Sequence, residues 1–129
     1  MARPASRHPT ELEFAILKIL WRDGPSSVRH VRDGLVPFRD LAYTSVMTIL
    51  GIMARKKYVR RSKSGSSYVY RAALTEQSAG RNMLDDIVLR VFDGSAVAVM
   101  QQLLETTDLD ADELAQIRQL IQRKAKEQS

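Results

Sequence analysis

The stretch AYTSVMTILGIMARKK, residues 42–57, decides the fold of this chain. At the helical spacing of about 100° per residue, its large apolar side chains fall on one stripe, formed by Val46, Ile49, Leu50 and Met53. The opposite side carries small or hydrogen-bonding residues and ends in a cation: Thr44, Thr48, Gly51 and Arg55. Lys56 and Lys57 follow. Such a helix buries one face. Its other face is either simply solvated or suited to the major groove of DNA, where hydroxyl and guanidinium groups reach base edges. The neighbouring segments decide between these two interpretations.

The segment before this helix predicts two further helices. TELE at residues 10–13 fits a capping box, in which a hydroxyl and a carboxylate satisfy each other's backbone amides, and a broad apolar stripe follows it. Gly-Pro at 24–25 ends this first helix, and Ser26–Ser27 offer the N-cap of a short second one. The apolar edge of the second helix consists of Val28, Val31 and Leu35. Residues 34–41 contain a proline and form the turn into the stretch above. This order of elements is a helix-turn-helix.

After residue 57 the pattern changes to that of a β-hairpin. Residues 58–62 and 67–71 are rich in β-branched and aromatic side chains, and KSGS at 63–66 supplies a glycine for a tight turn. The arms and tip carry four cations: Arg60, Arg61, Lys63 and Arg71. A charged hairpin can serve only as a sheet edge protected against aggregation. Directly after a polar-faced helix, however, it is typical of a winged helix-turn-helix, which uses the hairpin to grip the DNA backbone.

Charge and composition favour a DNA-binding first half and argue against several other functions. The 129-residue chain has a net charge of +5, divided into +9 over residues 1–71 and −4 over residues 72–129. A basic half predicts a polyanionic partner. The sequence has no cysteine and only two histidines, so we expect no cofactor and no metal site. An enzyme finds little support, because the close carboxylate pairs Asp85–Asp86 and Asp110/Asp112 lie at helix surfaces or caps.

The second half predicts three amphipathic helices. The first is capped by Thr75 and ends near Asp93–Gly94, the second starts at Ser95, and the third starts at the capping-box-like DADE of residues 110–113. Three helices in under about 60 residues make a thin core. Either a second copy of the chain covers the leftover apolar surface, or the helices pack back onto the first half. The residues expected at a dimer interface are Met83, Leu84, Ile87, Val88, Val91, Met100, Leu103, Leu104, Leu114, Ile117, Leu120 and Ile121.

These segments predict a mainly α-helical protein with three regions. We expect a flexible N-terminal arm over residues 1–9, a winged-helix DNA-binding domain of three helices and a hairpin wing over 10–73, and a helical dimerisation domain over 74–129. The sequence has neither a run of about 18 apolar residues nor the apolar region of a signal peptide. We therefore expect a cytoplasmic protein with no membrane partner.

A set of short motifs runs in order through nearly the whole chain. They are TELE through AILKILW (residues 10–21), GP with SVR (24–29), AYTSVMT (42–48), YVYR (68–71), FDGS (92–95) and DL (108–109). Together they closely resemble the penicillinase-repressor family of transcription factors (BlaI/MecI type). The resemblance implies an N-terminal winged helix that binds DNA and a C-terminal helical dimerisation region. It also implies repression of antibiotic-resistance or copper-handling genes from palindromic operators.

Three departures from the family pattern limit what the resemblance implies. Relatives commonly have Lys-Gly where this chain has Lys56–Lys57, so Lys57 needs a strained backbone or the helix ends elsewhere. The β-lactam-responsive members are cleaved at an Asn-Phe bond, and Gln102–Leu103 stand at that position here. The copper-responsive members use C-terminal cysteines, which this chain lacks. The inducing signal, and any upstream sensor or protease, are therefore unknown from the sequence.

The resulting hypothesis is a sequence-specific DNA-binding transcriptional repressor that acts as a homodimer on pseudo-palindromic operators of resistance or stress genes. Its partners are double-stranded operator DNA and a second copy of the chain. The candidate DNA contacts are Tyr43, Thr44, Ser45, Thr48, Gly51, Arg55, Lys56, Arg60, Arg61, Lys63 and Ser64. The alternative is a winged-helix protein–protein adaptor without sequence-specific DNA binding, whose acidic second half binds a partner.

Overall fold

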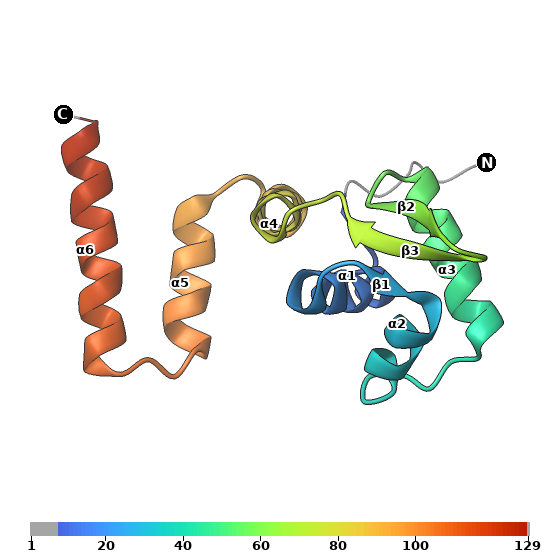
Figure 1. Cartoon of the computed structure of the whole chain (residues 1–129). Coiled ribbons are helices and arrows are strands. Elements are labelled where there is room, and N and C mark those ends of the chain that lie inside the picture. The colour runs from blue at the N-terminus through green and yellow to red at the C-terminus, as the bar shows by residue number, and fades with distance from the viewer. Residues whose placement is uncertain (1–7, 129) are drawn as a thin grey trace. The chain divides into compact units, whose positions relative to one another are not determined.

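The computed structural model describes residues 8–128, which form six helices, three short strands and two compact units that divide between Asp86 and Ile87 (Figure 1). The expected flexible arm lies mostly outside the described residues. Of its last two residues, Pro9 is buried, so the packed structure begins before residue 10. The first turns of the fourth helix belong to the first unit, although we expected the second region to start at residue 74.

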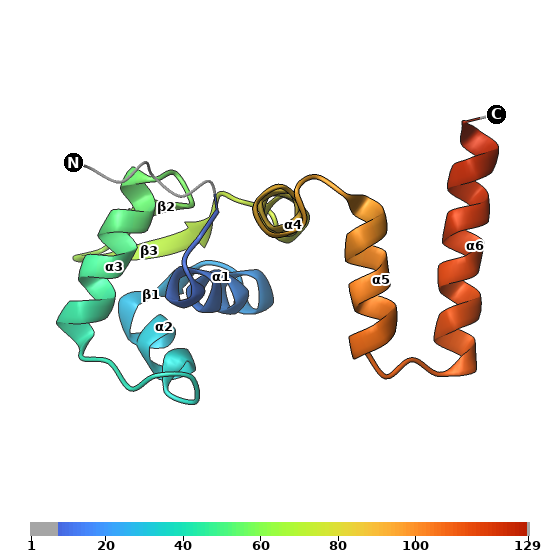
Figure 2. The ribbon, with the colours of Figure 1, turned by 180° about the vertical axis from the view of Figure 1, so that it is seen from behind.

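The first unit is the predicted winged helix-turn-helix. Its elements are α1 (Glu11–Asp23), β1 (Ser26–Ser27), α2 (Val28–Leu35), α3 (Tyr43–Arg55), β2 (Val59–Ser64) and β3 (Ser67–Ala72), followed by the start of α4 (Glu76–Phe92). The hairpin β2–β3 lies beside α3, as both views show (Figures 1 and 2). The apolar stripes of the three helices meet the inner face of the sheet. The buried core consists of Ile16, Leu17, Ile19, Leu20, Val28, Val31, Leu35, Val46, Leu50, Met53, Val59 and Tyr70.

The predicted helix starts are confirmed by their hydrogen bonds. Thr10 and Glu13 form the capping box of α1, and Ser27 caps α2 by accepting from the amide of His30. Thr75 accepts from the amide of Ser78 at the start of α4. These caps satisfy amides that have no partner within the helix, which is why local sequence was enough to locate the helix starts.

The hairpin turn is shorter than predicted. We expected residues 63–66 to form the turn, but β2 continues through Ser64, which pairs with Ser67 of β3. Gly65 and Ser66 alone connect the strands, with Gly65 at a φ of 64°. This is the position at which a type II′ hairpin favours glycine, and such two-residue turns match the twist of the strands.

The sheet also contains a strand that the sequence did not reveal. Ser26–Ser27 form β1, which pairs antiparallel with Tyr70 and Val69 of β3 and gives the strand order β1-β3-β2. A two-residue strand has no period of its own, and the same serines read as a helix cap. Ser27 performs both functions.

The second unit contains the end of α4, then α5 (Ala96–Thr106) and α6 (Ala111–Glu127). Ser95 caps α5, and Asp110 forms a capping box with Glu113 at the start of α6, as predicted. The helices α5 and α6 run antiparallel with almost no packing between them (Figure 1). No residue of either helix is buried. Their apolar stripes are therefore open.

None of the helices in residues 8–128 has by itself the length and apolar composition needed to cross a bilayer. Only α4 and α5 taken together, with the bend between them, have the required length and apolar composition.

Candidate nucleic-acid interface

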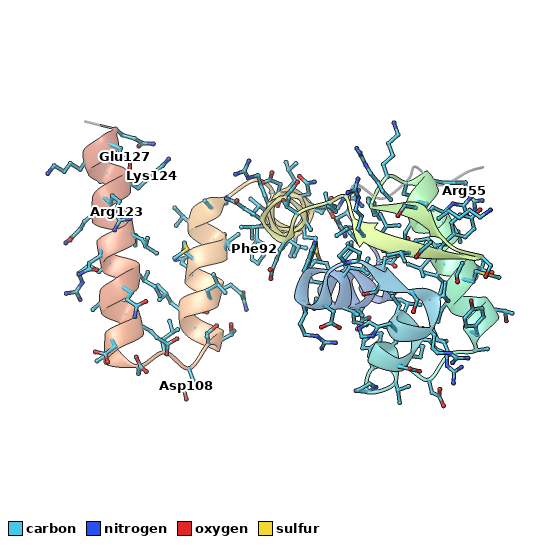
Figure 3. The ribbon with its side chains drawn as sticks, viewed as in Figure 1. Arg55, Phe92, Asp108, Arg123, Lys124 and Glu127 are labelled. Carbon is cyan, nitrogen blue, oxygen red and sulfur yellow. The ribbon has the colours of Figure 1, made fainter. Side chains whose placement is uncertain are left out.

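The helix α3 presents the face that we expected to meet DNA. Val46, Leu50 and Met53 are completely buried, which orients the opposite side of the helix outward. The exposed residues on its first two turns are Tyr43, Thr44, Ser45, Met47 and Thr48. Arg55 is exposed at the C-terminal end of the helix (Figure 3). The predicted division into a packed stripe and an outer stripe is confirmed.

Two details of α3 define what its outer face can do. The Thr48 hydroxyl donates to the carbonyl of Thr44 at 3.0 Å, so toward a partner it offers lone pairs and a methyl group. A Cβ placed on Gly51 would meet nothing within 4 Å. Internal packing therefore does not require this glycine, whereas its missing side chain would let another backbone come close.

The N-terminus of α3 has no side-chain cap, because Ala42 occupies the N-cap position. The first amides of this helix are thus available to an outside acceptor, and the helix dipole favours an anion there. In a DNA-binding unit that acceptor would be a phosphate oxygen.

Lys56, one of the candidate DNA contacts, is exposed, but its ammonium is held in an ion pair within the first unit. Its ammonium lies 2.9 and 3.2 Å from the two carboxylate oxygens of Glu13, a residue that is only 4% exposed. One of those oxygens also accepts from the amide of Thr10 at 2.9 Å. A buried carboxylate requires a partner of this kind. Lys56 therefore joins the end of α3 to the start of α1.

Lys57 has the strained backbone that its place in the family pattern predicted. Its φ is 68°, in the left-handed region. The amide of Tyr58 donates to Met53 at 2.9 Å and that of Lys57 to Ala54 at 3.1 Å, which together form a Schellman motif. The helix thus ends in the geometry that glycine adopts most easily, without the glycine.

The strand register separates the cations of the hairpin onto two faces. Side chains alternate along a strand, and directly paired residues share a face. Arg61 pairs with the buried Tyr70 and Lys63 with Tyr68, so both cations lie on the face that carries the helices. Arg60 pairs with Arg71 on the opposite face. The structure therefore separates Arg60 from Arg61 and Lys63.

A groove of about 560 Å³ lies between the start of α3, the start of α2 and the hairpin. Residues that we did not expect at the interface line it, namely Ser27, Arg29, Met47, Ser66, Ser67 and Tyr68, together with the predicted Tyr43. Beside it, the Arg61 guanidinium lies 4.4 Å from the Tyr68 ring centroid. The position of Arg29 in the first turn of α2, two residues after the cap, was the signal that could have identified it.

Acidic partners neutralise some of the cations near the groove. This reduces the number of cations there that are available to DNA. Arg22 donates twice to Asp23, and Nε2 of His30 lies 2.8 Å from the same carboxylate. The hydrogen bonds from Arg22 and then from His30 hold the pKa of the Asp23 carboxyl well below its usual range. Arg29 has no ion pair among the residues that the structure describes. Its charge remains available to a phosphate.

The residues expected at the dimer interface divide between the two units. Met83 and Leu84 belong to the first unit, where Met83 lies beside Pro9 and Phe14. Most of the others, Leu103, Leu104, Leu114, Leu120 and Ile121 among them, are exposed apolar residues. Ile117, Met100 and Val88 are half-buried. Within residues 8–128, no cluster of His, Cys, Asp or Glu is suited to hold a metal ion.

Comparison with known proteins identifies the family. The Penicillinase repressor family matches residues 9–123. The chain is 31% identical over 102 residues to the transcriptional regulator BlaI of Mycobacterium tuberculosis, which covers 78% of this chain and 74% of that protein. It is 19% identical to the methicillin resistance regulatory protein MecI of Mammaliicoccus sciuri, over 87% of this chain and 91% of that one.

Among solved structures, a MarR family protein from Bacillus stearothermophilus is similar with a TM-score of 0.47 and 16% identity, covering 93% of this chain and 75% of that chain. The family match alone spans most of the sequence and agrees with the winged helix described above. The chain therefore belongs to the penicillinase repressor family of DNA-binding transcriptional repressors, which are not enzymes.

Proposed function

We propose that this repressor acts as a homodimer and reads a pseudo-palindromic operator with α3 in the major groove. The observation that carries the proposal is the outer face of α3. This face carries the hydroxyl and methyl groups of threonines, a glycine and the guanidinium of Arg55. It lies opposite three completely buried apolar residues. Two such helices would enter grooves about 34–36 Å apart, which makes the operator as symmetric as the dimer.

Within this interface we assign base reading to the outer stripe of α3. Thr44, Thr48 and Arg55 would reach base edges or adjacent phosphates, and Gly51 would allow close approach. Met47 is 45% exposed on the same side, and its apolar end suits the methyl group of thymine. This last assignment adds a residue that pattern reasoning had left unused.

Residues of the groove, of the start of α3 and of the inner face of the hairpin would hold the sugar–phosphate backbone. Tyr43, Ser45, Arg29, Arg61 and Lys63 are the proposed contacts, because they surround the uncapped start of α3 or lie on the inner face of the hairpin. Ser64 belongs to the hairpin tip and is a weaker candidate of the same kind. Arg60 faces away and Lys56 is paired with Glu13, so we leave both out of the proposed set.

Self-association is supported by the second unit. The helices α5 and α6 bury no residue and leave apolar side chains open on both, with leucines on α5 and leucines and an isoleucine on α6. Burial of apolar surface gains about 25 cal/mol per Å². A second copy of the chain offers the same surface, and a two-fold pair would also supply the second α3 that a palindromic site requires.

The first target to test is the DNA upstream of the protein's own coding region. Names of relatives such as MecI refer to methicillin resistance, so resistance or stress genes are the class of target that we propose. Footprinting of the full-length protein should show two protected half-sites of related sequence, about one helical turn or a multiple of it apart. Equal affinity for this fragment and for a scrambled duplex would contradict the proposal and favour the adaptor hypothesis.

Two variants separate sequence reading from backbone binding. Arg55→Ala should weaken binding to the operator more than to a scrambled duplex, by about 1–3 kcal/mol. Lys63→Ala should weaken both duplexes alike and lower the salt slope by about 1. The matched control is Arg123→Ala, which removes one exposed charge from α6 and should change neither (Figure 3). Fluorescence anisotropy at several salt concentrations measures all three.

A further inference from the structure

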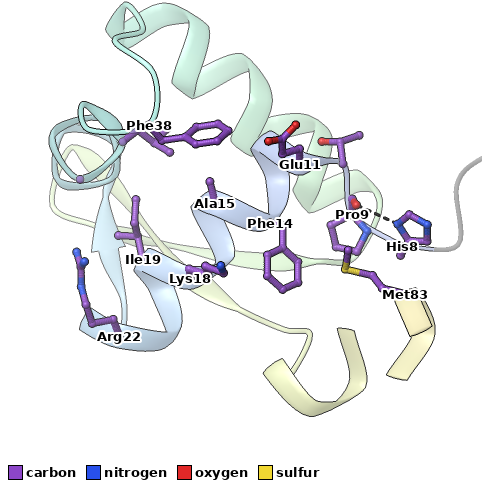
Figure 4. A pocket seen from close by; sticks show the side chains of 13 residues that line it. His8, Pro9, Glu11, Phe14, Ala15, Lys18, Ile19, Arg22, Phe38 and Met83 are labelled. Carbon is purple, nitrogen blue, oxygen red and sulfur yellow. Dashed lines mark hydrogen bonds between the residues drawn. The ribbon is translucent and has the colours of Figure 1, made fainter. Parts of the chain in front are cut away.

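The first unit contains a second hollow, away from the proposed DNA contacts, with a volume of about 560 Å³. It runs along the outward side of α1 (Figure 4). The segment that follows α2 forms one wall, and His8, Pro9 and Met83 lie at the other. None of the residues assigned to the DNA interface lines it.

Small residues create this hollow, and large apolar ones line it. Ala15 points into it from α1, between the side chains of Phe14, Ile19 and Phe38 (Figure 4). Gly34 lies at the same wall, where an added Cβ would come within 2.9 Å of the Ile19 side chain. A volume in this range with an apolar lining and few polar groups is typical of sites for small organic ligands.

An acidic and a basic side chain lie at different points along the hollow. Glu11 lies at the N-terminal end of α1 and Lys18 seven residues later, about 10 Å along the helix axis. The Lys18 ammonium lies 5.2 Å from the centroid of the Phe14 ring and has no ion pair among residues 8–128. Arg22, farther along, is already bonded to Asp23. The open cation therefore stands directly over an aromatic wall.

We propose that this hollow binds a small aromatic carboxylic acid and that its occupancy alters DNA binding. The ring of the ligand would lie between Phe14 and Phe38, above Ala15, and its carboxylate would meet Lys18. Apolar burial would supply most of the affinity, and the charge-assisted hydrogen bond would select an acid over its neutral amide.

The effect on DNA rests on the proposed function and on the path of the chain. Leu35 and Phe38 line the hollow, and the carbonyl of Leu35 accepts from the amides of Phe38 at 2.9 Å and Arg39 at 2.7 Å. This short turn leads directly into α3. A ligand that contacts Phe38 therefore acts on the segment that determines where α3, the proposed recognition helix, begins. Such a ligand changes operator affinity only if it binds more tightly to one position of that helix than to another.

The first experiment measures binding without DNA. An amide NMR titration of the full chain with naphthoate should shift the signals of Ala15, Lys18 and Phe38, and naphthamide should bind more weakly. Ala15→Phe, which fills the hollow, should abolish binding. Lys18→Gln should weaken it about tenfold or more, as expected for the loss of one charged hydrogen bond. Lys124→Gln, which removes one lysine charge from α6, should leave it unchanged. Absence of shifts at millimolar naphthoate, or binding that survives Ala15→Phe, would overturn the site.

The second experiment repeats the operator titration with naphthoate present. Operator affinity should change for the wild type and not for Ala15→Phe. Binding to the hollow with no change in operator affinity would overturn the regulatory part of the proposal. The NMR result does not depend on an operator, so failure of the site and failure of the DNA-binding proposal give different outcomes.

Discussion

The two units of the molecule differ in how they use apolar residues. In the first unit three helices and a sheet enclose a core of twelve buried side chains. In the second unit α5 and α6 have regular caps and clear apolar stripes but bury no residue. Local sequence is thus sufficient to form a helix in both units. Only the first unit also contains the neighbouring helices and strands that cover an apolar stripe and form a core. The apolar stripes of α5 and α6 in the second unit are therefore left open.

The sharpest test of this contrast compares one leucine from each unit. Leu50→Ala should lower the free energy of unfolding by about 3 kcal/mol, because it opens a cavity at a completely buried site. Leu120→Ala, at a residue 58% exposed, should hardly change it. Trp21 is the only tryptophan in the chain and lies in the first unit, so its fluorescence during urea unfolding reports on that unit. Equal destabilisation by both variants would contradict the contrast.

The next largest effect concerns the link between α1 and α3. Glu13→Gln should destabilise the first unit by about 2 kcal/mol, because the amide carries no charge to balance the Lys56 ammonium and offers it only one acceptor oxygen. Glu11→Gln, two residues earlier on the same helix and exposed, is the matched control and should stay within about 0.5 kcal/mol of the wild type. The measurement is again urea unfolding. A Glu13→Gln protein as stable as its control would show that the pair contributes nothing.

A charge on the exposed apolar face of α6 tests whether a second copy of the chain covers that face. Leu120→Glu should raise the dimer dissociation constant about tenfold or more, because a carboxylate would enter an apolar interface. Gln119→Glu adds the same charge on the other side of the helix and should leave association unchanged. Sedimentation equilibrium measures both. If the wild type is monomeric at micromolar concentration, the proposed dimer is refuted.

The smallest expected effect concerns a local feature of the first unit. Lys57→Gly should stabilise it by about 1 kcal/mol, because glycine adopts the left-handed conformation observed there without steric cost. Lys57→Ala keeps a Cβ and should give little or no gain. Thermal unfolding can resolve this difference. Stabilisation of the same size by alanine would point to the lost charge instead of the backbone.

Much of the candidate site was predictable, because it depends on one helix. The period of residues 42–57 fixes which side chains of α3 are buried, so the exposed threonines and Arg55 followed from the sequence alone. The inward or outward side of each hairpin cation did not follow. Our predicted turn of 63–66 places Ser62 opposite Ser67, whereas the structure pairs Ser62 with Val69. This shift of two residues keeps each side chain on its face, and only the packing of the hairpin on the helices decides which face is inward. The sequence therefore could not separate Arg60 from Arg61 and Lys63.

The helices and their caps followed from the sequence, because each depends on residues within a few positions of one another. The separation of a basic half from an acidic one followed from composition. Only the tertiary structure decided that Lys56 pairs with Glu13, that Ser26 and Ser27 add a third strand, and that α1 carries a lined hollow beside Phe38. Each of these joins groups far apart along the chain. Such contacts depend on how whole helices and strands pack against one another. The spacing of residues within one segment does not predict this packing.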